Sequence, residues 1–293
     1  MPGAITLLDG GMGQELRKRG LTEERLWSAH TLMTRPEEVR RLHEEFIDAG
    51  AEIITTANYS TTPKRFAIDG LRNRVTDVTR IAAEVANEAR RGRGGVRIAG
   101  SLPPLLASYE PDAAGTFEEM LPDYEEIVAA LAPGVDLFIC ETMASATESR
   151  AAATAAAATG KPIWVSWTLQ DEKTNRLRSG ETIAEALRQV SALPIDAFLF
   201  NCCSPETMTP ALPILRAATD RPIGAYANAF TPIPKDWRRR ADRLRDLRED
   251  LDAEGFASFA APWFRSGATI VGGCCGASPG HIAALRRLIE ATT

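Results

Sequence analysis

Five cysteines carry the clearest chemical signal in the sequence: Cys140 stands alone, and the others form the adjacent pairs Cys202/Cys203 and Cys274/Cys275. An odd number of cysteines with no recognisable signal peptide is a poor match to a disulfide framework, and adjacent cysteines rarely bond each other without strain. Thiolates are also zinc ligands, and a catalytic zinc site combines three protein ligands with one open position. Three of the four paired thiols would complete such a site.

The spacing of the pairs separates this pattern from a zinc finger. Zinc fingers use short local hooks of ligands, whereas about seventy residues lie between the two pairs. Two consecutive residues can ligate one ion only where the backbone turns sharply, and Gly272, Gly273 and Gly276 would permit that turn. The alternative is that cysteines serve as small buried apolar residues. We expect that role for Cys140, which lies inside an apolar run.

The type of ligand also restricts the chemistry of such a site. Three thiolates leave a zinc ion with a net charge near −1, so it activates water or a carbonyl less well than a site with three histidines. It is better suited to binding a fourth thiol as a thiolate, because coordination lowers the pKa of that thiol and leaves the sulfur electron-rich. The cysteines therefore predict a thiol substrate that accepts an alkyl group.

The elements that must position these cysteines alternate along the chain. Short apolar runs rich in β-branched residues alternate with segments of helical period, which is typical of βα units and a parallel sheet. We predict strands at 5–8, 52–56, 96–99, 136–140, 162–167, 197–201, 222–226 and 268–271. Helices are predicted near 36–49, 75–91, 117–131, 145–159, 181–191, 205–218, 253–266 and 278–291. Eight such units favour an α/β fold with a single (βα)8 barrel over a doubly wound open sheet.

Either fold places functional side chains at the carboxyl ends of its strands. The pair at Cys202 follows the sixth predicted strand and the pair at Cys274 follows the eighth. We therefore expect all four thiols on one rim of the barrel.

Composition and charge exclude several classes of protein. The 293 residues are 44% hydrophobic and 25% charged, which is typical of a globular chain and not of a disordered or collagenous one. A net charge of −5 argues against a nucleic-acid partner, which requires clustered positive charge. No stretch approaches the length of a membrane span, so we expect a cytoplasmic protein with no membrane partner.

One domain is expected to take up residues 1–293, because one (βα)8 barrel often occupies this length. An insertion at about 228–252 interrupts the βα rhythm, and its charges of mixed sign indicate a solvated helical face. We expect a monomer or a small homo-oligomer.

Several motifs resemble one known family over essentially the whole chain. They are LLDGGMGQEL at 7–16, LWSA at 26–29, PEEVRRLHEEFIDAGAEIITTANY at 36–59, ETM at 141–143, NCCSP at 201–205 and GGCCG at 272–276. The sequence resembles the homocysteine S-methyltransferases, and the combination of NC with a distant GGCC is the most specific of these matches. The resemblance implies a zinc-dependent (βα)8 barrel that transfers a methyl group to homocysteine and forms methionine.

The resemblance also implies roles for particular residues. The zinc ligands of the family fall on Cys202, Cys274 and Cys275, which leaves Cys203 as an additional thiol. Asp9 and Glu141 match carboxylates that hold the amino group of the substrate. A free ammonium favours such partners.

Other matched residues would contact the substrate carboxylate and the methyl donor. Gly10 and Gly11 would let backbone N–H groups approach the substrate carboxylate. Trp27 and Tyr59 match aromatic residues that border the methyl donor in betaine-dependent relatives, where an aromatic face attracts a cation. We place the neighbouring Asn58 in the substrate site as well.

The sequence leaves open which methyl donor is used. It also leaves open two functions other than methyl transfer. The chain lacks the long carboxyl-terminal extension of betaine-dependent relatives and any cobalamin module, which favours a sulfonium donor such as S-methylmethionine over betaine or another donor. The segment GSLPPLLASYEPD at 100–112 differs from the corresponding stretch of S-methylmethionine-dependent members. The alternatives from other classes are a zinc-dependent hydrolase or lyase, and a non-catalytic protein that binds zinc or thiols.

Overall fold

The computed structural model describes residues 4–22, 26–172, 174–233 and 246–292. Eight parallel strands form one sheet in the order β1-β8-β7-β6-β5-β4-β3-β2. The strands are β1 Thr6–Leu7, β2 Ile53–Thr55, β3 Arg97–Leu102, β4 Leu137–Met143, β5 Ile163–Trp167, β6 Ile195–Asn201, β7 Ile223–Ala227 and β8 Ala268–Gly273. A parallel bridge between Leu8 and Ile53 joins the two ends of this order. The sheet is therefore closed, which confirms the barrel and excludes the open sheet.

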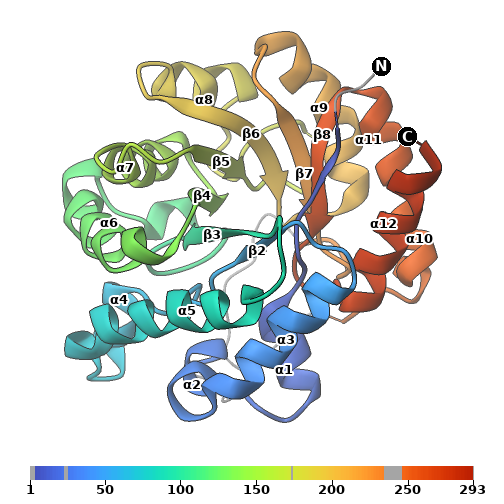
Figure 1. Cartoon of the computed structure of the whole chain (residues 1–293). Coiled ribbons are helices and arrows are strands. Elements are labelled where there is room, and N and C mark those ends of the chain that lie inside the picture. The colour runs from blue at the N-terminus through green and yellow to red at the C-terminus, as the bar shows by residue number, and fades with distance from the viewer. Residues whose placement is uncertain (1–3, 23–25, 173, 234–245, 293) are drawn as a thin grey trace.

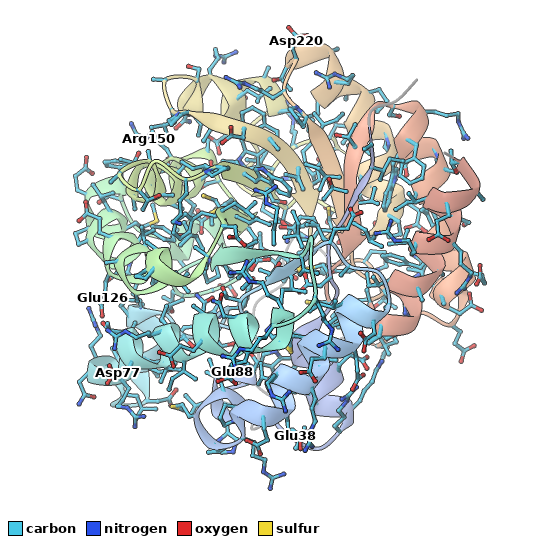
Figure 2. The ribbon with its side chains drawn as sticks, in the orientation of Figure 1. Glu38, Asp77, Glu88, Glu126, Arg150 and Asp220 are labelled. Carbon is cyan, nitrogen blue, oxygen red and sulfur yellow. The ribbon has the colours of Figure 1, made fainter. Side chains whose placement is uncertain are left out.

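The helices surround the strands, as Figure 1 shows. They are α1 Met12–Lys18, α2 Ser28–Thr34, α3 Pro36–Asp48, α4 Pro63–Ile68, α5 Val75–Arg90, α6 Phe117–Leu131, α7 Ala146–Ala157, α8 Ile183–Val190, α9 Pro205–Ala218, α10 Ala253–Ser258, α11 Ala260–Arg265 and α12 Pro279–Thr292. Charged side chains such as Glu38, Asp77 and Glu126 lie on the outer faces of these helices (Figure 2). None of the helices in the described ranges is long and apolar enough to cross a membrane.

The predicted helices are present, with one divided in two. The segment predicted at 253–266 forms α10 and α11, which meet at Phe259. Pro262 has no N–H to donate to the carbonyl of Ser258, so a continuous helix would lose a hydrogen bond at this point. The short helices α1, α2 and α4 were not predicted, because six or seven residues are too few to show a helical period.

Side chains at the helix starts fix where each loop ends. Pro36 occupies the first turn of α3 beside Glu37 and Glu38, where a missing N–H costs nothing and acidic groups complement the helix dipole. Capping boxes open α6, α7 and α8, in which the side chain of Thr116, Ser145 or Thr182 accepts from the backbone three residues later. These caps set the length of the loops between the strands and the helices that follow them.

The side chains that face into the barrel change from apolar to polar along the strands, and the polar ones line the candidate site. One buried apolar cluster draws on all the strands or their ends: Leu8, Ile53, Ala99, Leu137, Ile139, Trp164, Ala197, Leu199, Tyr226 and Ile270. Because side chains alternate in a strand, the next inward positions toward the carboxyl ends are polar, among them Glu141 after Ile139 and Asn201 after Leu199. Apolar side chains therefore fill the barrel interior beneath a layer of polar groups at the carboxyl ends of the strands.

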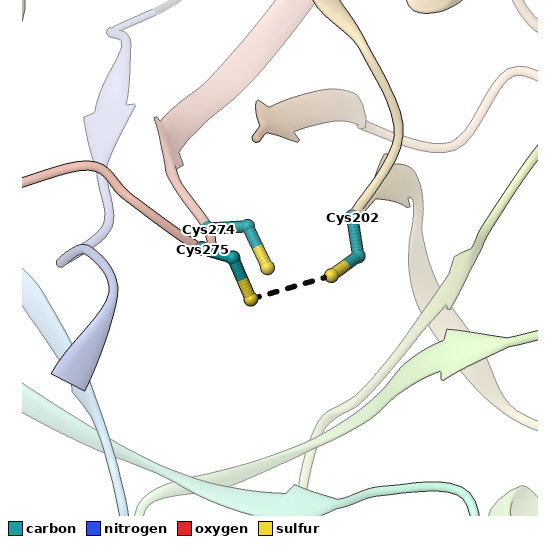
Figure 3. Close-up of side chains that lie close together, drawn as sticks. All are labelled: Cys202, Cys274 and Cys275. Carbon is teal, nitrogen blue, oxygen red and sulfur yellow. Dashed lines mark hydrogen bonds between the residues drawn. The ribbon is translucent and has the colours of Figure 1, made fainter. Parts of the chain in front are cut away.

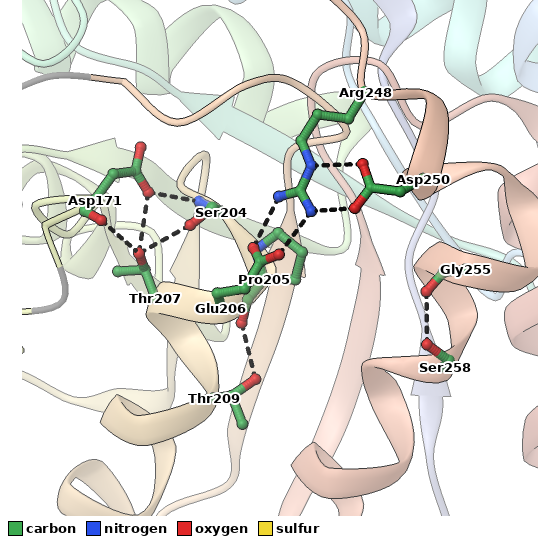
Figure 4. Close-up of polar contacts among 10 residues, drawn as sticks. All are labelled: Asp171, Ser204, Pro205, Glu206, Thr207, Thr209, Arg248, Asp250, Gly255 and Ser258. Carbon is green, nitrogen blue, oxygen red and sulfur yellow. Dashed lines mark hydrogen bonds and ion pairs between the residues drawn. The ribbon is translucent and has the colours of Figure 1, made fainter.

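The predicted insertion at about 228–252 is described only at its two ends, because 234–245 lie outside the described residues. The ends pair with each other through an antiparallel bridge between Phe230 and Leu247. Arg248 then binds both Glu206 at the start of α9 and Asp250 (Figure 4). The predicted helical face within the insertion is therefore untested.

Candidate functional site

Three cysteine side chains converge at the carboxyl ends of two strands. Cys202 follows β6, while Cys274 and Cys275 follow β8, as predicted. Their sulfur atoms lie within 4.8 Å of one another, and those of Cys202 and Cys275 are 3.8 Å apart (Figure 3). Tetrahedral zinc with Zn–S bonds of about 2.3 Å separates two sulfur ligands by about 3.8 Å. The cluster thus has the donor atoms and spacing that a zinc ion requires.

The backbone around the cluster explains part of the glycine pattern. Gly276 has a φ of 85° and makes the turn that follows the cysteine pair. Gly272 and Gly273 lie in β8 and do not form this turn, so the prediction was wrong for them. They are glycines because space is lacking: a Cβ on Gly273 would lie 2.2 Å from that of Ala277, and one on Gly272 would lie 2.6 Å from that of Leu8.

The charges of three such close thiols depend on one another. Hydrogen bonds from Cys274 and Cys275 hold the pKa of Cys202 well below its usual range. The pKa of Cys274 and that of Cys275 are raised, because each lies beside the Cys202 sulfur. The sulfur of Cys202 is therefore the one that ionises most readily. A bound cation is needed for all three to be thiolates.

Two buried carboxyl groups line the same pocket. Burial raises the pKa of Asp9 to about 7, although the backbone N–H of Thr55 donates to it at 2.8 Å. Burial also raises the pKa of Glu141 to about 8, and the Ser101 hydroxyl donates to this carboxyl. Carboxyl groups in such surroundings gain strongly from a cationic partner. The pair is therefore suited to a cationic partner, and its contact with the ammonium group of the substrate stays a prediction.

The two glycines after Asp9 pack against the turn that carries the cysteines. A Cβ on Gly10 would lie 2.5 Å from the carbonyl oxygen of Ala277, and one on Gly11 would lie 2.7 Å from that of Cys274. The N–H of Gly11 donates to Ala277 at 2.8 Å, so this amide is already engaged. Both residues line the pocket, and their small size is required by the close approach of the two loops.

The predicted aromatic residues also line the pocket, but the protein's own cations contact them. The guanidinium of Arg17 lies 5.8 Å from the centre of the Trp27 ring, and that of Arg65 lies 5.4 Å from the centre of the Tyr59 ring. The Tyr59 hydroxyl is 2.8 Å from that of Ser108. Each ring is therefore already in contact with a cation of the protein.

Asn58 does not lie on the pocket, contrary to the prediction. Its side chain is fully buried, accepts from the Thr56 hydroxyl at 2.6 Å and donates to the Ser101 carbonyl at 3.0 Å. Both ends of the amide are thus used to hold the segment after β2 against β3. Tyr59 lies in the turn after Asn58 and does line the pocket, so the place of Tyr59 did not extend to its neighbour.

The two remaining cysteines are separate from the cluster. Cys140 is fully buried in the core between the sheet and the helices, as predicted. Cys203 is fully buried in the same core, and burial raises the pKa of its thiol well above the usual range. Neither thiol lines the pocket, so three of the five take part in the cluster, and the expectation that all four paired thiols lie on the rim was wrong for Cys203.

The complete pocket has a volume of about 250 Å³, which suits small molecules. It is lined by the cysteine cluster and the residues described above, together with others that the sequence did not single out: Met12, Gln14, Ser28, Ser60, Arg65, Ser108, Tyr109, Tyr226, Phe230 and Ile233. Tyr109 is the most notable of these, because its hydroxyl is 2.9 Å from the Cys202 sulfur. It lies in the segment 100–112, whose departure from the family pattern was the one available signal.

A closed parallel barrel with a thiol cluster and two buried carboxyls around one pocket defines a (βα)8-barrel enzyme with a metal-type site. A family model described as homocysteine S-methyltransferase matches residues 6–289. The chain belongs to the homocysteine S-methyltransferase family. The resemblance drawn from the motifs is thereby confirmed, and the prediction of a methyltransferase enzyme is confirmed at the level of the family.

Individual relatives match over nearly their whole length. The homocysteine S-methyltransferase of Escherichia coli (strain K12) is 31% identical, with 96% of this chain and 94% of that protein covered. A selenocysteine methyltransferase of Astragalus bisulcatus is 27% identical, with 98% and 93% covered. The crystal structure of the metallated form of the Escherichia coli homocysteine methyltransferase MmuM has a TM-score of 0.82 at 30% identity, covering 97% of this chain and 96% of that one.

Proposed function

We propose that this protein transfers a methyl group from a sulfonium donor such as S-methylmethionine to the thiol of L-homocysteine, and so forms methionine. The observation that carries the proposal is that one pocket holds both a cluster of three thiols and a pair of buried carboxyls. The carboxyls suit the ammonium of an amino acid, and the cluster suits its thiol. The proposal treats the whole chain as one barrel domain.

We assign zinc to Cys202, Cys274 and Cys275. The fit rests on the number of thiol donors, their mutual distances and the need for a cation among them. When bound, zinc would supply the positive charge that keeps the acceptor sulfur in its thiolate form at neutral pH. Every other contribution comes from the side chains of the pocket.

Asp9 and Glu141 orient the acceptor in this account. The ammonium of the substrate would lie between the two carboxyls, where each gains a partner for its charge. The backbone at Gly10 is the remaining candidate for the substrate carboxylate, since the Gly11 amide donates to Ala277. The acceptor is thereby held at one end while its sulfur faces the cysteines.

The methyl transfer itself requires no general base among these residues. The acceptor sulfur forms a bond to the methyl carbon while the bond from that carbon to the donor sulfur breaks. The electron pair leaves with the donor, which becomes a neutral thioether. The side chains of Trp27 and Tyr59 border this space, and their rings, which Arg17 and Arg65 contact in this structure, would favour a sulfonium group over a neutral donor if it approached a ring face. Positioning of the two substrates then accounts for the protein's part in the step.

A panel of donors and acceptors tests this proposal. The zinc-loaded protein is incubated with homocysteine and trideuteromethyl-labelled S-methylmethionine, S-adenosylmethionine or betaine, and labelled methionine is measured by mass spectrometry. The proposal predicts the highest rate with S-methylmethionine. Selenohomocysteine and selenocysteine serve as alternative acceptors. Absence of labelled product with every sulfonium donor would refute the proposal and favour a hydrolase, a lyase or a binding protein.

A further inference from the structure

Tyr109 approaches the cysteine cluster from a loop that the sequence motifs do not include. This residue lies between β3 and α6, and its hydroxyl is 2.9 Å from the Cys202 sulfur. A phenol O–H is a stronger donor than a thiol S–H, and a thiolate is a good acceptor. The hydrogen bond therefore runs from Tyr109 to Cys202 when the cysteine is ionised.

Both partners of this hydrogen bond have an unusual backbone conformation. Tyr109 has a φ of 69° and Cys202 has a φ of 57°. Residues other than glycine seldom adopt this left-handed region, and such strain persists where the surrounding contacts impose it. The contacts on both sides of the pair must therefore hold these two residues in place.

The loop of Tyr109 is held from the side of α4. The Tyr59 hydroxyl contacts that of Ser108 at 2.8 Å, and Arg65 donates from Nε to the carbonyl of Leu106 at 2.8 Å. On the other side, the guanidinium of Arg178 lies 5.2 Å from the centre of the Tyr109 ring. The ring is thus fixed by the contacts of its own loop with Tyr59 and Arg65 and by a cation at its face.

Asp171 joins this ring contact to the backbone of Cys202. The Arg178 and Asp171 side chains form an ion pair at 3.3 Å and are each only 3% exposed. Asp171 also accepts from the N–H of Ser204 at 2.7 Å, two residues after Cys202 (Figure 4). One buried carboxylate therefore fixes the turn that carries Cys202 and, through Arg178, the tyrosine that contacts its sulfur.

We propose that Tyr109 is a positioning residue for Cys202, and that the pair Arg178 and Asp171 holds it in place. The proposal rests on the assignment of Cys202 as a metal ligand under the proposed function. The Tyr109 hydroxyl fixes the direction of the Cys202 sulfur and disperses part of the negative charge of a three-thiolate site. Groups that orient metal ligands in this way typically contribute about 10–100-fold to metal affinity.

The test compares Y109F with a matched loss of a tyrosine hydroxyl. Tyr124 is fully buried in α6 and donates to the carbonyl of Pro103, on the same β3–α6 connection, without reaching the cluster. Zinc affinity is measured by competition with a chromophoric chelator for wild type, Y109F and Y124F. The cobalt-substituted proteins are also compared through their near-ultraviolet thiolate-to-metal absorption, which reports the charge on the thiolates.

We expect Y109F to bind zinc about 10–100-fold more weakly and to shift the absorption band to lower energy, since a hydrogen bond to a thiolate is lost. Y124F should keep the wild-type affinity and band. If Y109F binds zinc within twofold of the wild-type affinity and its absorption band is unchanged, the inference about Tyr109 is wrong. The proposed function would still stand. Failure of the wild-type protein to bind zinc would overturn the proposed function, and the inference with it.

Discussion

The amide nitrogen of Asn201, the last residue of β6, lies 3.8 Å from the sulfur of Cys274, which follows β8. The other atoms of this amide connect two more strands. Its oxygen accepts from the Thr142 N–H at 2.8 Å and from the Ser166 hydroxyl at 2.7 Å. A single fully buried side chain thus ties the strands beneath the cysteine cluster to one of its thiols.

Replacing Asn201 by leucine should therefore affect both stability and metal binding. The free energy of unfolding should fall by about 1–3 kcal/mol, because buried donors of Thr142 and Ser166 lose their acceptor. Zinc content should fall as well. Chemical denaturation and elemental analysis measure the two effects. The control is Asn87→Leu, which removes hydrogen bonds to Ala83 and Gly134 far from the cluster and should lower stability only. Normal zinc content in Asn201→Leu would contradict the account.

Removing the charge of either pocket carboxyl should weaken binding of the acceptor. Asp9→Asn and Glu141→Gln should each raise the KM for homocysteine by roughly 10–100-fold, because a charge-assisted hydrogen bond is worth about 1.5–3 kcal/mol. Steady-state kinetics measure this change. Glu148→Gln is the matched control, since burial also raises the pKa of Glu148 to about 7 but its contacts are the amides at the start of α7. An equal effect in all three variants would argue against a role in substrate binding.

The same carboxyls predict a pH dependence of kcat/KM. Burial raises the pKa of Asp9 to about 7 and that of Glu141 to about 8, so both become neutral in the free enzyme as the pH falls through this range. A neutral carboxyl pairs poorly with an ammonium, so kcat/KM for homocysteine should decrease from pH 9 to pH 6. The slope should be smaller in Glu141→Gln. An identical profile in wild type and this variant would assign the titration to another group.

His43 should make the fold sensitive to acid. Its ring is fully buried in α3, and neither ring nitrogen has a hydrogen-bond partner within the described part of the chain. Burial lowers its pKa from 6.5 to about 4, so the unfolded chain takes up the proton first. Stability is therefore intact above pH 6.5 and is lost as the pH falls toward 4, by on the order of 3 kcal/mol. His43→Leu should lose less stability over this range in denaturation at several pH values, and parallel losses would contradict the assignment.

Metal removal should change the number of reactive thiols. A bound zinc ion protects its thiolate ligands, whereas Cys140 and Cys203 are fully buried in either case. Chelation should therefore raise the number of thiols that react with a disulfide reagent under native conditions from near zero to about two, because Cys274 and Cys275 are partly exposed whereas Cys202 is buried. All five should react in denaturant. The same native count before and after chelation would argue against the three-cysteine site.

The sequence predicted the parts of the site that directly follow strands. Cys202 and Cys274 could be placed on one rim because β6 and β8 are parallel and both cysteines come directly after them. Glu141 was placed there because it follows the strand predicted at 136–140; it lies inside the longer β4, two residues beyond the inward-facing Ile139, and so reaches the same rim.

The parts that depend on loop packing could not be predicted in this way. Tyr109 lies in a connection without periodicity, and its approach to Cys202 depends on contacts with α4 and Arg178. Asn58 was placed in the substrate site from its neighbour Tyr59, but the direction of a side chain depends on the local backbone. The role of Gly273 could not be predicted because its close neighbour, Ala277, belongs to the following loop.

The most direct test of the central claim is the zinc content of the purified protein measured beside its rate of methionine formation. The account predicts about one zinc ion per chain in the wild type, and the loss of both zinc and activity in Cys202→Ala, Cys274→Ala and Cys275→Ala. Cys203→Ala is the control and should retain both, because its thiol lies in the core. Full methionine formation by a metal-free Cys274→Ala variant would contradict the account.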